Sequence, residues 1–234
     1  TACSAADWAA AARQEIAKLH AEGAIPILVG GTGLYLRTLL DGIAPIPEIA
    51  PDIRATVREL PVADAYAALM REDPERAARL DPGDTTRIAR ALEVVRSTGK
   101  PLSFWQERRE GGISAEVSLH PAVLLPERAE LYRRCDLRFA GMMENGAVEE
   151  VERLLLRGLP EDLPVMRAIG VPEIVGFLRG EWSREEATAK GAQATRNYAK
   201  RQFTWAKHQF PPHWPRHPLH DYELSTYFER LLLI

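Results

Sequence analysis

The feature that most constrains the fold is an apolar run that stops abruptly at a glycine-rich turn. Residues Ile25–Val29 are apolar throughout, and a Gly-Gly-Thr-Gly turn follows at positions 30–33. A short apolar run bounded by glycine is typical of a buried strand in a parallel sheet. Regularly spaced leucines from Leu34 to Leu40 then predict a helix, which Gly42 ends. This order of elements predicts half of a doubly wound α/β unit.

The turn at positions 30–33 is a candidate ligand site, because α/β folds bind ligands at the carboxyl ends of their strands. Glycines there let another molecule approach the backbone closely. The hydroxyl of Thr32 could cap the helix that follows or point at a ligand. An ordinary strand–helix turn explains the same residues equally well. The phosphate-loop pattern GxxxxGK[ST] does not occur in this sequence.

The rest of the chain is mainly helical by the spacing of its apolar residues. A proline-rich linker at 43–51 separates the first part from these helices, and apolar runs predict further strands at 117–125 and, more briefly, at 220–224. Helices are predicted at residues 5–19, 52–60, 62–71, 74–80, 85–97, 102–109, 127–144, 147–156 and 183–209. The predicted fold class is therefore α/β, with a helical body attached to a fragment of parallel sheet.

The composition is that of a folded globular protein, but its charge is unevenly distributed. The 234 residues are 46% hydrophobic and 27% charged, which excludes wholesale disorder and a fibrous protein. The net charge of −3 gives no overall sign of nucleic-acid binding. Residues 187–220, however, contain no Asp or Glu. The basic residues of this stretch are Lys190, Arg196, Lys200, Arg201, Lys207 and Arg216.

The last long predicted helix carries the most distinctive part of this basic stretch. Arg196 and Lys200 lie four residues apart, Arg201 follows, and Tyr198 and Trp205 are interleaved with them. Basic residues mixed with aromatic ones are typical of nucleic-acid binding, since charges follow phosphates and rings stack on bases. We expect the aromatic side chains to belong to the core. We expect the basic ones to bind an anion, because no acid balances them along the sequence.

Two arginine pairs elsewhere have the spacing of an anion site. Arg87 and Arg90 lie in the first turns of a predicted helix, where a phosphate would relieve their repulsion by the helix dipole. Solvated side chains are the simpler interpretation of that pair. Arg134 and Arg138 share a helix face after the strand predicted at 117–125, and guanidinium groups match phosphate oxygens. Pairing with an acid on the same helix would account for one of these two arginines.

The cysteines and histidines point to no strong metal or disulfide site. Cys3 and Cys135 are far apart and form no CxxC motif, which favours a reduced, cytosolic protein. The sequence contains no signal peptide and no apolar run long enough to span a bilayer. Four histidines occur at positions 208, 213, 217 and 220, without a cysteine nearby. Isolated surface histidines are the simpler interpretation.

Four motifs in this order resemble the tRNA dimethylallyltransferases, also called tRNA isopentenyltransferases. They are Ile-Leu-Val-Gly-Gly-Thr-Gly-Leu-Tyr-Leu at 27–36, Asp-Thr-Thr-Arg-Ile-Ala-Arg-Ala-Leu-Glu-Val at 84–94, Met-Arg-Ala-Ile-Gly at 166–170, and Gln-Ala-Thr-Arg-Asn-Tyr-Ala-Lys-Arg-Gln-Phe-Thr-Trp at 193–205. The resemblance implies transfer of the dimethylallyl group from dimethylallyl diphosphate to N6 of adenine 37 in tRNA. It also implies a P-loop-kinase-like parallel-sheet core, a helical insertion that grips the anticodon arm, and Mg²⁺ as cofactor.

The resemblance also implies domains. Residues 1–48 and 118–137 would form part of the α/β core, residues 49–117 and 138–210 a helical tRNA-binding region, and residues 211–234 a return to the core. The family's phosphate loop and its general-base Asp do not occur in this sequence, so we expect Thr1 to lie inside a longer protein and assign no catalytic residue. Gly170–Glu173 also departs from the family pattern Gly-Tyr-Lys/Arg-Glu/Gln.

Residue roles follow from the resemblance together with the basic motifs above. Arg138, with Arg134, would hold the diphosphate. The expected tRNA contacts are Thr32, Arg54, Thr86, Arg87, Ile88, Ala89, Arg90, Arg167, Arg196, Lys200 and Arg201. Three other functions remain open: a prenyltransferase for free adenine nucleotides, a P-loop kinase fragment with a helical lid, and a non-catalytic RNA-binding module. We expect a cytoplasmic monomer without a membrane partner.

Overall fold

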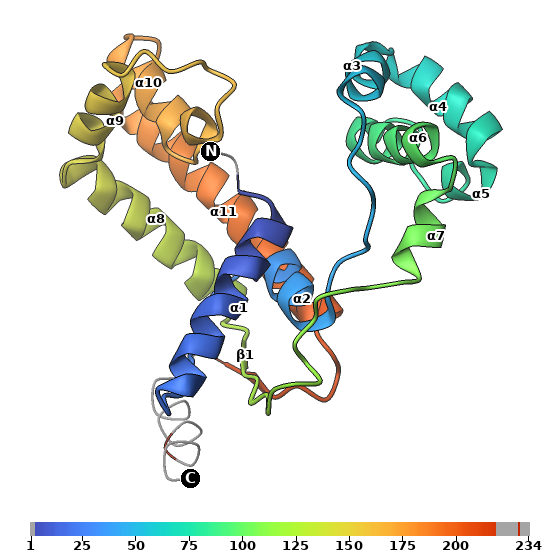
Figure 1. Cartoon of the computed structure of the whole chain (residues 1–234). Coiled ribbons are helices and arrows are strands. Elements are labelled where there is room, and N and C mark those ends of the chain that lie inside the picture. Colours follow the sequence, from blue (N-terminus) through green and yellow to red (C-terminus); the bar gives the residue numbers. More distant parts are fainter. Residues whose placement is uncertain (1–2, 219–228, 230–234) are drawn as a thin grey trace. The chain divides into compact units, whose positions relative to one another are not determined.

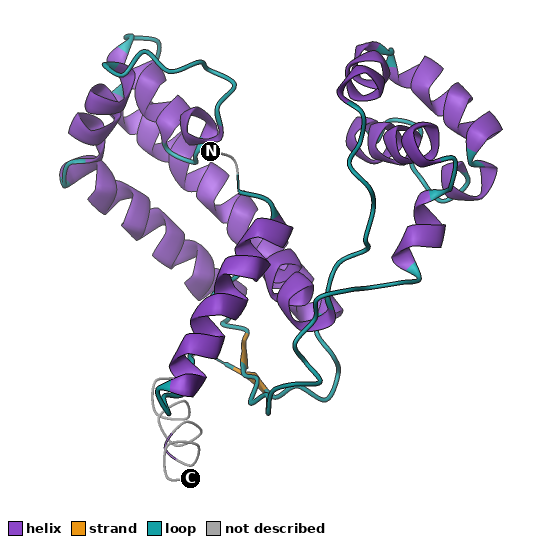
Figure 2. Cartoon of the chain, viewed as in Figure 1, coloured by secondary structure: helices purple, strands orange, loops and turns teal. Residues whose placement is uncertain are grey.

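The computed structural model describes residues 3–218 and 229, and their contacts form two compact units. Unit 1 contains residues 28–33 and the chain from Leu119 onward, and unit 2 contains residues 3–27 and 34–118. Helices make up most of both units (Figure 2). The units divide the chain by contacts, whereas the division into a core and a tRNA-binding region stays a prediction.

Unit 2 begins with helix α1 (Ala5–Ala21), which is predicted correctly. Ser4 caps it: its hydroxyl accepts from the backbone N–H of Asp7, and the Asp7 carboxylate accepts from the backbone N–H of Ser4. Helix α2 (Gly33–Asp41) follows the glycine turn, as the leucine spacing predicts. Ala9, Leu39 and Ile113 form a small buried cluster that joins α1, α2 and the segment near residue 113.

The remaining helices of unit 2 form a separate group with its own core. They are α3 (Pro51–Glu59), α4 (Val62–Glu72), α5 (Pro74–Ala77), α6 (Thr85–Thr98) and α7 (Leu102–Gln106) (Figure 1). Ile88, Ala91 and Leu92 of α6 are fully buried, as their spacing predicts, and pack with Val57 and Leu69. Asp84 caps α6 by accepting from the backbone N–H of Arg87, and Gly99 ends it in a left-handed conformation.

The two chain segments that enter and leave this helix group pair with each other. The backbone of Ile43 exchanges two hydrogen bonds of 3.0 Å with that of Glu110. Gly42, at φ +83°, lies so close to the Glu110 carbonyl that a Cβ would clash with it. Helices α3–α7 are therefore an insertion with adjacent ends, as the linker at 43–51 suggests.

In its described residues up to 218, unit 1 combines a small parallel sheet with four helices and one 3₁₀ turn. Strand β1 (Val123–Leu124) pairs in parallel with β2 (Arg216–His217), with Val123 opposite Arg216. Helices α8 (Arg128–Glu144), α9 (Ala147–Leu155), α10 (Val171–Leu178) and α11 (Arg184–Gln209) follow β1, with a 3₁₀ turn, η1 (Pro164–Arg167), between α9 and α10. Ser183 and Glu186 form the predicted capping box at the start of α11.

Helices α8 and α11 pack side by side through one aromatic ring (Figure 1). Phe139 of α8 is buried and lies directly over Gly191 of α11, where a Cβ would overlap its ring. The same ring lies 3.3 Å from the position of a Cβ on Gly170. Met143, Val148 and Ile174 complete this core. Two glycines thus allow α8, α10 and α11 to meet around Phe139.

The structure corrects several predicted elements. Ile25–Val29 does not form a strand, and its side chains are largely exposed, with Val29 at 89%. A strand needs a neighbour for its backbone N–H and C=O groups, and no other described segment pairs with this one. The run at 117–125 forms a strand only at Val123–Leu124, and helix α10 is not predicted at all. The short strand predicted at 220–224 lies outside the described residues.

Replacing Gly191 with Ala tests the packing around Phe139. Alanine favours a helix over glycine by about 1 kcal/mol, but overpacking a filled core costs about 1–3 kcal/mol and sometimes more. We therefore expect Gly191→Ala to lower the free energy of unfolding by about 2 kcal/mol, measured by chemical denaturation. Gly141→Ala in α8 is the matched control, because nothing lies within 4 Å of a Cβ there. Equal or greater stability of Gly191→Ala would contradict the packing.

Candidate nucleic-acid interface

One basic residue in the acid-free stretch of α11 is paired with a carboxylate of another helix. Arg196 forms an ion pair with Asp136 of α8, and its other Nη donates to Gln193 Oε1 at 2.6 Å. The expectation that no acid balances this stretch is therefore wrong for Arg196. The error has a simple cause, because Asp136 lies 60 residues away in sequence. Arg196 joins α11 to α8, and its role as a tRNA contact stays a prediction.

Two further basic residues of the stretch also have structural partners. Lys190 Nζ lies 4.7 Å from the ring centre of Trp182. Arg216 donates to the carbonyls of the four residues Phe210, Pro211, Pro212 and Trp214, at 2.9–3.3 Å. Arg216 thereby holds the turn that connects α11 to β2, and its guanidinium is largely consumed by that role.

Two of the remaining basic residues, Lys200 and Arg201, line an open groove along α11. Lys200 and Arg201 are exposed there, and the Arg201 guanidinium lies 5.4 Å from the ring centre of Tyr198. Lys200 has no ion-pair partner among the described residues. The groove is lined by Asn197, Lys200, Arg201, Thr204, Trp205, His208 and Gln209. Such a surface offers charge for phosphates and amide and hydroxyl groups for hydrogen bonds.

The aromatic residues of α11 divide between core and surface. Trp205 is half-buried and packs edge-on against Phe210 at 4.9 Å between ring centres, as expected for a core residue. Phe210 in turn stacks on Trp214 at 4.8 Å. Tyr198 is exposed, so the prediction that it belongs to the core is wrong. Its ring is open to solvent beside Arg201, an arrangement that suits stacking on a base.

The glycine turn at 30–33 packs on the same helix. A Cβ on Gly31 would lie 2.7 Å from the Gln202 side chain, and a Cβ on Gly33 would overlap the Trp205 ring. The partner that approaches these glycines closely is thus α11 itself. Thr32 lies between them, is exposed, and makes no side-chain hydrogen bond among the described residues. Its hydroxyl is therefore available to a ligand beside this contact with α11.

The two arginines predicted to hold a diphosphate both lie on α8, but they differ in their partners. Glu130 Oε1 accepts from Arg134 Nε at 2.7 Å, and its other oxygen accepts from Arg133 at the same distance. These hydrogen bonds, that of Arg133 first, lower the pKa of Glu130 to about 2. Pairing with an acid on the same helix therefore accounts for Arg134. Arg138 is exposed and has no ion-pair partner in the part of the chain that the structure describes.

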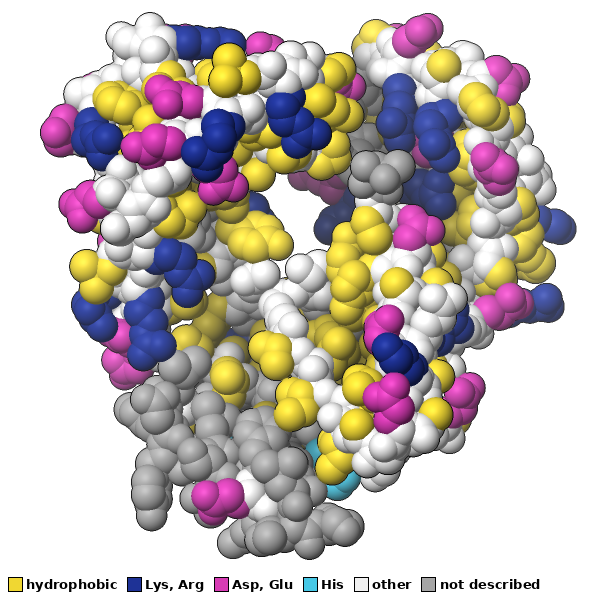
Figure 3. All heavy atoms as spheres, turned by 60° about the vertical axis from the view of Figure 1, so that its left-hand side comes forward, with side chains coloured by type: hydrophobic (Ala, Val, Ile, Leu, Met, Phe, Trp, Pro, Cys, Tyr) yellow, Lys and Arg dark blue, Asp and Glu magenta, His cyan; other side chains and the backbone are white. Residues whose placement is uncertain are grey.

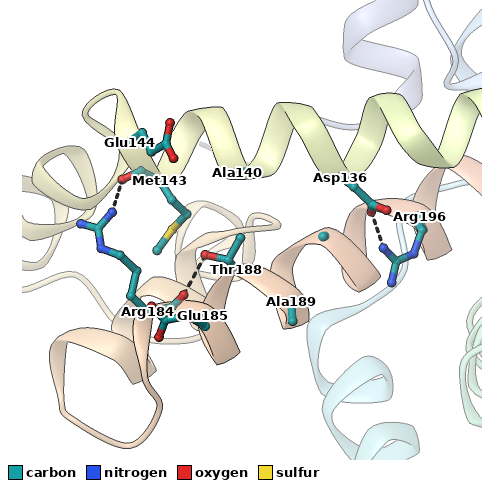
Figure 4. A pocket seen from close by; sticks show the side chains of 10 residues that line it. Asp136, Ala140, Met143, Glu144, Arg184, Glu185, Thr188, Ala189 and Arg196 are labelled. Carbon is teal, nitrogen blue, oxygen red and sulfur yellow. Dashed lines mark hydrogen bonds and ion pairs between the residues drawn. The ribbon is translucent and has the colours of Figure 1, made fainter.

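A second groove lies between α8 and α11 (Figure 4). Alanines at 140, 189 and 192 leave room along its floor. Arg184 stands at one end, where it donates to the Met143 carbonyl at 2.7 Å, and the Asp136–Arg196 pair stands at the other. Because both arginines are already engaged, this groove offers a ligand mainly apolar contact.

Unit 2 carries a second basic surface, on helices α3 and α6. Arg54 is exposed without an ion-pair partner among the described residues. Arg87 lies 3.4 Å from Asp84, and Arg90 lies 3.7 Å from Glu93. Thr86 is exposed and Ala89 half-buried, whereas Ile88 is fully buried in the core. The prediction that Ile88 contacts tRNA is therefore wrong for its side chain, because an apolar residue on the inner face of α6 packs against α3 and α4.

Two further residues of this surface, Arg58 and Glu93, were not predicted from the sequence. Arg58 lies one turn after Arg54 on α3, and it donates from Nε to Glu93 Oε1 at 2.9 Å. The four-residue spacing of Arg54 and Arg58 was a usable signal. Nothing in the sequence marks Glu93 as buried, because it borders the apolar positions of α6 as many solvated acids do.

The remaining predicted contact, Arg167, is exposed at the end of η1. The following segment departs from the family pattern without disturbing the backbone. Gly170, at φ +102°, precedes α10, and Glu173 accepts from its backbone N–H at 2.9 Å. Pro172 stands in the first turn of α10, where its missing N–H costs nothing.

Metal binding and membrane insertion find little support in the described residues. No group of three or more His, Cys, Asp or Glu among them could hold a metal ion. None of the helices in the described part is both long and apolar enough to cross a membrane. In the face drawn in Figure 3, acidic and basic side chains are interspersed.

Comparison with known proteins identifies the family. The family model described as IPP transferase matches residues 1–209. The chain belongs to this family. The resemblance of the four sequence motifs is thereby confirmed at the level of the IPP transferase family.

Two relatives that are both named tRNA dimethylallyltransferase are similar to most of this chain. A tRNA dimethylallyltransferase of Novosphingobium aromaticivorans is 66% identical over 92% of this chain and 76% of its own length. One of Erythrobacter litoralis is 59% identical over 98% of this chain and 73% of its own length.

Solved structures of similar proteins support the fold of this IPP transferase. The tRNA isopentenylpyrophosphate transferase of Bacillus halodurans matches with a TM-score of 0.63 at 28% identity, covering 100% of this chain and 74% of that one. A eukaryotic dimethylallyltransferase acting on tRNA matches with a TM-score of 0.77 at 23% identity, covering 98% of this chain and 60% of that one. The second likeness concerns the fold alone.

The lowered pKa of Glu130 predicts a pH dependence of stability. In the unfolded chain this carboxyl titrates at its ordinary pKa near 4.5, and in the folded chain at about 2. Its ion pairs therefore stabilise the fold fully above pH 4.5, and the contribution is lost as the pH falls toward 2. We expect the stability difference between the unsubstituted chain and Glu130→Gln to be constant from pH 7 to 5 and to vanish near pH 2. A difference independent of pH, measured by chemical denaturation, would contradict the assignment.

Proposed function

We propose that the protein that contains this chain transfers the dimethylallyl group of dimethylallyl diphosphate to N6 of adenine 37 in tRNA, and that this chain supplies contacts with both substrates. In this reaction N6 forms a bond to C1 of the dimethylallyl group, and the C–O bond to the diphosphate breaks. The electron pair leaves with the diphosphate, and a proton leaves N6 for a base. The observation that carries the proposal is the 66% identity, over 92% of the chain, to a protein of that name.

The geometry of unit 1 supports contacts with both substrates. Arg138 has a free guanidinium, which suits the oxygens of the diphosphate as negative charge develops on the leaving group. Lys200 and Arg201 suit RNA phosphates, and the exposed Tyr198 ring suits a base turned out of its stack. Thr32, in the turn that packs on α11, has an exposed hydroxyl without a hydrogen-bond partner among the described residues. No residue of the chain is assigned as the base.

The proposal includes Mg²⁺ as cofactor, which would neutralise charge on the diphosphate when bound. The described residues form no cluster of three metal ligands. Mg²⁺ commonly keeps several waters and binds one or two carboxylates together with substrate phosphates, so it needs few protein ligands. None of the residue roles proposed above depends on the metal.

The proposal also extends to the architecture. We assign the β1–β2 pair and the turn at 30–33 to an α/β core of the P-loop-kinase kind, and the helical parts to tRNA binding. The parallel pairing of β1 with β2 supports this assignment. We further propose a cytoplasmic monomer, since tRNA is the substrate and each unit carries its own basic surface.

A free adenine nucleotide as acceptor is the alternative with the same chemistry. It would require only a small site, whereas α11 alone carries an open groove bordered by Lys200 and Arg201. A transfer assay separates the two: labelled dimethylallyl diphosphate is mixed with the full-length protein that contains this chain and with either tRNA or adenosine monophosphate. We expect label on the tRNA. Label on the nucleotide alone, or no transfer to either substrate by that folded protein, would contradict the proposal.

Removing the exposed charges of α11 should weaken RNA binding. The double variant Lys200→Ala, Arg201→Ala loses two candidate phosphate contacts. We expect its affinity for a tRNA anticodon stem-loop to fall and the slope of log K against log salt to flatten by about 1–2. Arg153→Ala, Arg157→Ala in and beside α9 is the matched control, with the same change in charge. Equal slopes for the two double variants would contradict the proposed role.

The two arginines of α8 should differ in their effect on the small substrate. Hydrogen bonds to charged groups contribute about 1.5–3 kcal/mol, so we expect Arg138→Ala to weaken binding of dimethylallyl diphosphate at least about tenfold. Arg134→Ala is the comparison, because Glu130 already holds that side chain. Calorimetric titration measures both. A defect confined to tRNA binding, or a larger effect of Arg134→Ala, would show that the roles are misassigned.

A further inference from the structure

Glu93 of α6 is a buried carboxylate in the middle of a basic surface. Its side chain is only 3% exposed, although it lies on the helix that carries Arg87 and Arg90. A buried carboxylate is unfavourable unless opposite charges and hydrogen bonds compensate it. Neighbouring basic side chains therefore have to compensate its negative charge.

Two guanidinium groups share this carboxylate, one from each of two helices. Arg58 of α3 donates from Nε to Oε1 at 2.9 Å, and Arg90 of α6 places Nη1 3.7 Å from Oε2. The Arg58 side chain is nevertheless 65% exposed and that of Arg90 43% exposed. Arg58 is thus hydrogen-bonded at one edge and open to solvent at the other, whereas Arg90 is held to the carboxylate by charge alone, at ion-pair distance.

The contacts leave most of the donors of these arginines unused. A guanidinium has five N–H donors, and Arg58 engages only the one on Nε among the described residues. The Arg96–Glu72 pair between α6 and α4 shows the contrasting arrangement. Arg96 gives both Nε and Nη2 to the Glu72 carboxylate, and its side chain is half-buried. Arg96 thus gives one whole edge of its guanidinium to Glu72, whereas Arg58 gives Glu93 a single N–H donor.

The local charge around Glu93 favours an anion. Two arginines face one carboxylate, and Arg54 adds a third guanidinium one turn before Arg58 on the same face of α3. Arg87 stands one turn before Arg90, although Asp84 lies beside it. Since the hydrogen bond to Glu93 already restricts the rotamers of Arg58, binding a phosphate costs that side chain less further entropy.

We propose that Glu93 is a positioning residue that holds Arg58 and Arg90 as a two-pronged clamp for phosphates of the tRNA backbone. The proposal assigns Arg58 as a further tRNA contact. It rests on the proposed function, because it names the substrate group that this surface takes.

The test measures binding of the chain to a tRNA anticodon stem-loop and to a scrambled hairpin of equal length, over a series of salt concentrations. Arg58→Ala removes one prong. We expect it to weaken stem-loop binding about tenfold and to flatten the salt slope by about one. Arg58→Lys keeps the charge but loses the planar fork, so we expect part of the affinity to be lost with the slope unchanged.

Glu93→Gln separates positioning from charge. It makes the surface more basic by one unit, so charge alone predicts tighter binding to both hairpins. Loss of positioning instead predicts that the preference for the stem-loop falls at least about fivefold while binding to the scrambled hairpin holds or tightens. Arg96→Ala and Glu72→Gln break the other interhelical pair and are expected to leave the preference unchanged. Thermal unfolding of every variant confirms that it folds.

The outcomes separate the two proposals. Equal tightening of both hairpins by Glu93→Gln overturns the positioning role, and an Arg58→Ala variant that behaves like Arg96→Ala overturns the clamp. In both cases the unsubstituted chain still prefers the stem-loop, so the proposed function stands. If the unsubstituted chain itself shows no preference, the tRNA function fails and the clamp fails with it.

Discussion

The position of helix α11 depends on close contacts that only glycine permits. Phe139 of α8 lies against Gly191 of α11, and the turn at 30–33 approaches the Trp205 ring through Gly33. Larger side chains at these points would push the segments apart, because protein interiors have little spare volume. The groove beside Lys200, the free hydroxyl of Thr32 and the Asp136–Arg196 pair are all placed by this packing.

Charged side chains in this chain fall into two groups with different roles. In one, the guanidinium is consumed by the fold, as for Arg216 on four carbonyls and Arg96 on Glu72. In the other, it is open to solvent, as for Arg138, or anchored at only one edge, as for Arg58. Only the second group has donors left for phosphate. Each unit carries members of this group, and this is the physical basis for proposing a substrate as large as tRNA.

The sequence predicted helices well and long-range partners poorly. Apolar periodicity and capping residues such as Ser4, Ser183 and Asp84 are local signals, and the helices they predict are confirmed. The strand at 25–29 was wrong because an apolar run indicates burial but not the neighbour that a strand requires. Asp136 opposite Arg196 and Glu93 opposite Arg58 were missed because both partnerships join elements that are distant in sequence. The family motifs located the basic segments but could not tell which arginines the fold had already engaged.

Two open basic surfaces, one on α11 and the other on α3 and α6, are proposed here to bind the anticodon arm of tRNA. Hydrogen–deuterium exchange of the folded chain, with and without an anticodon stem-loop, tests it most directly, because binding slows amide exchange where the RNA lies. The account predicts protection at residues 197–209 and in the α3 and α6 segments around Arg58 and Arg90, with α9 unchanged. Protection confined to α9, or absent from the first two regions while the RNA is bound, would contradict it.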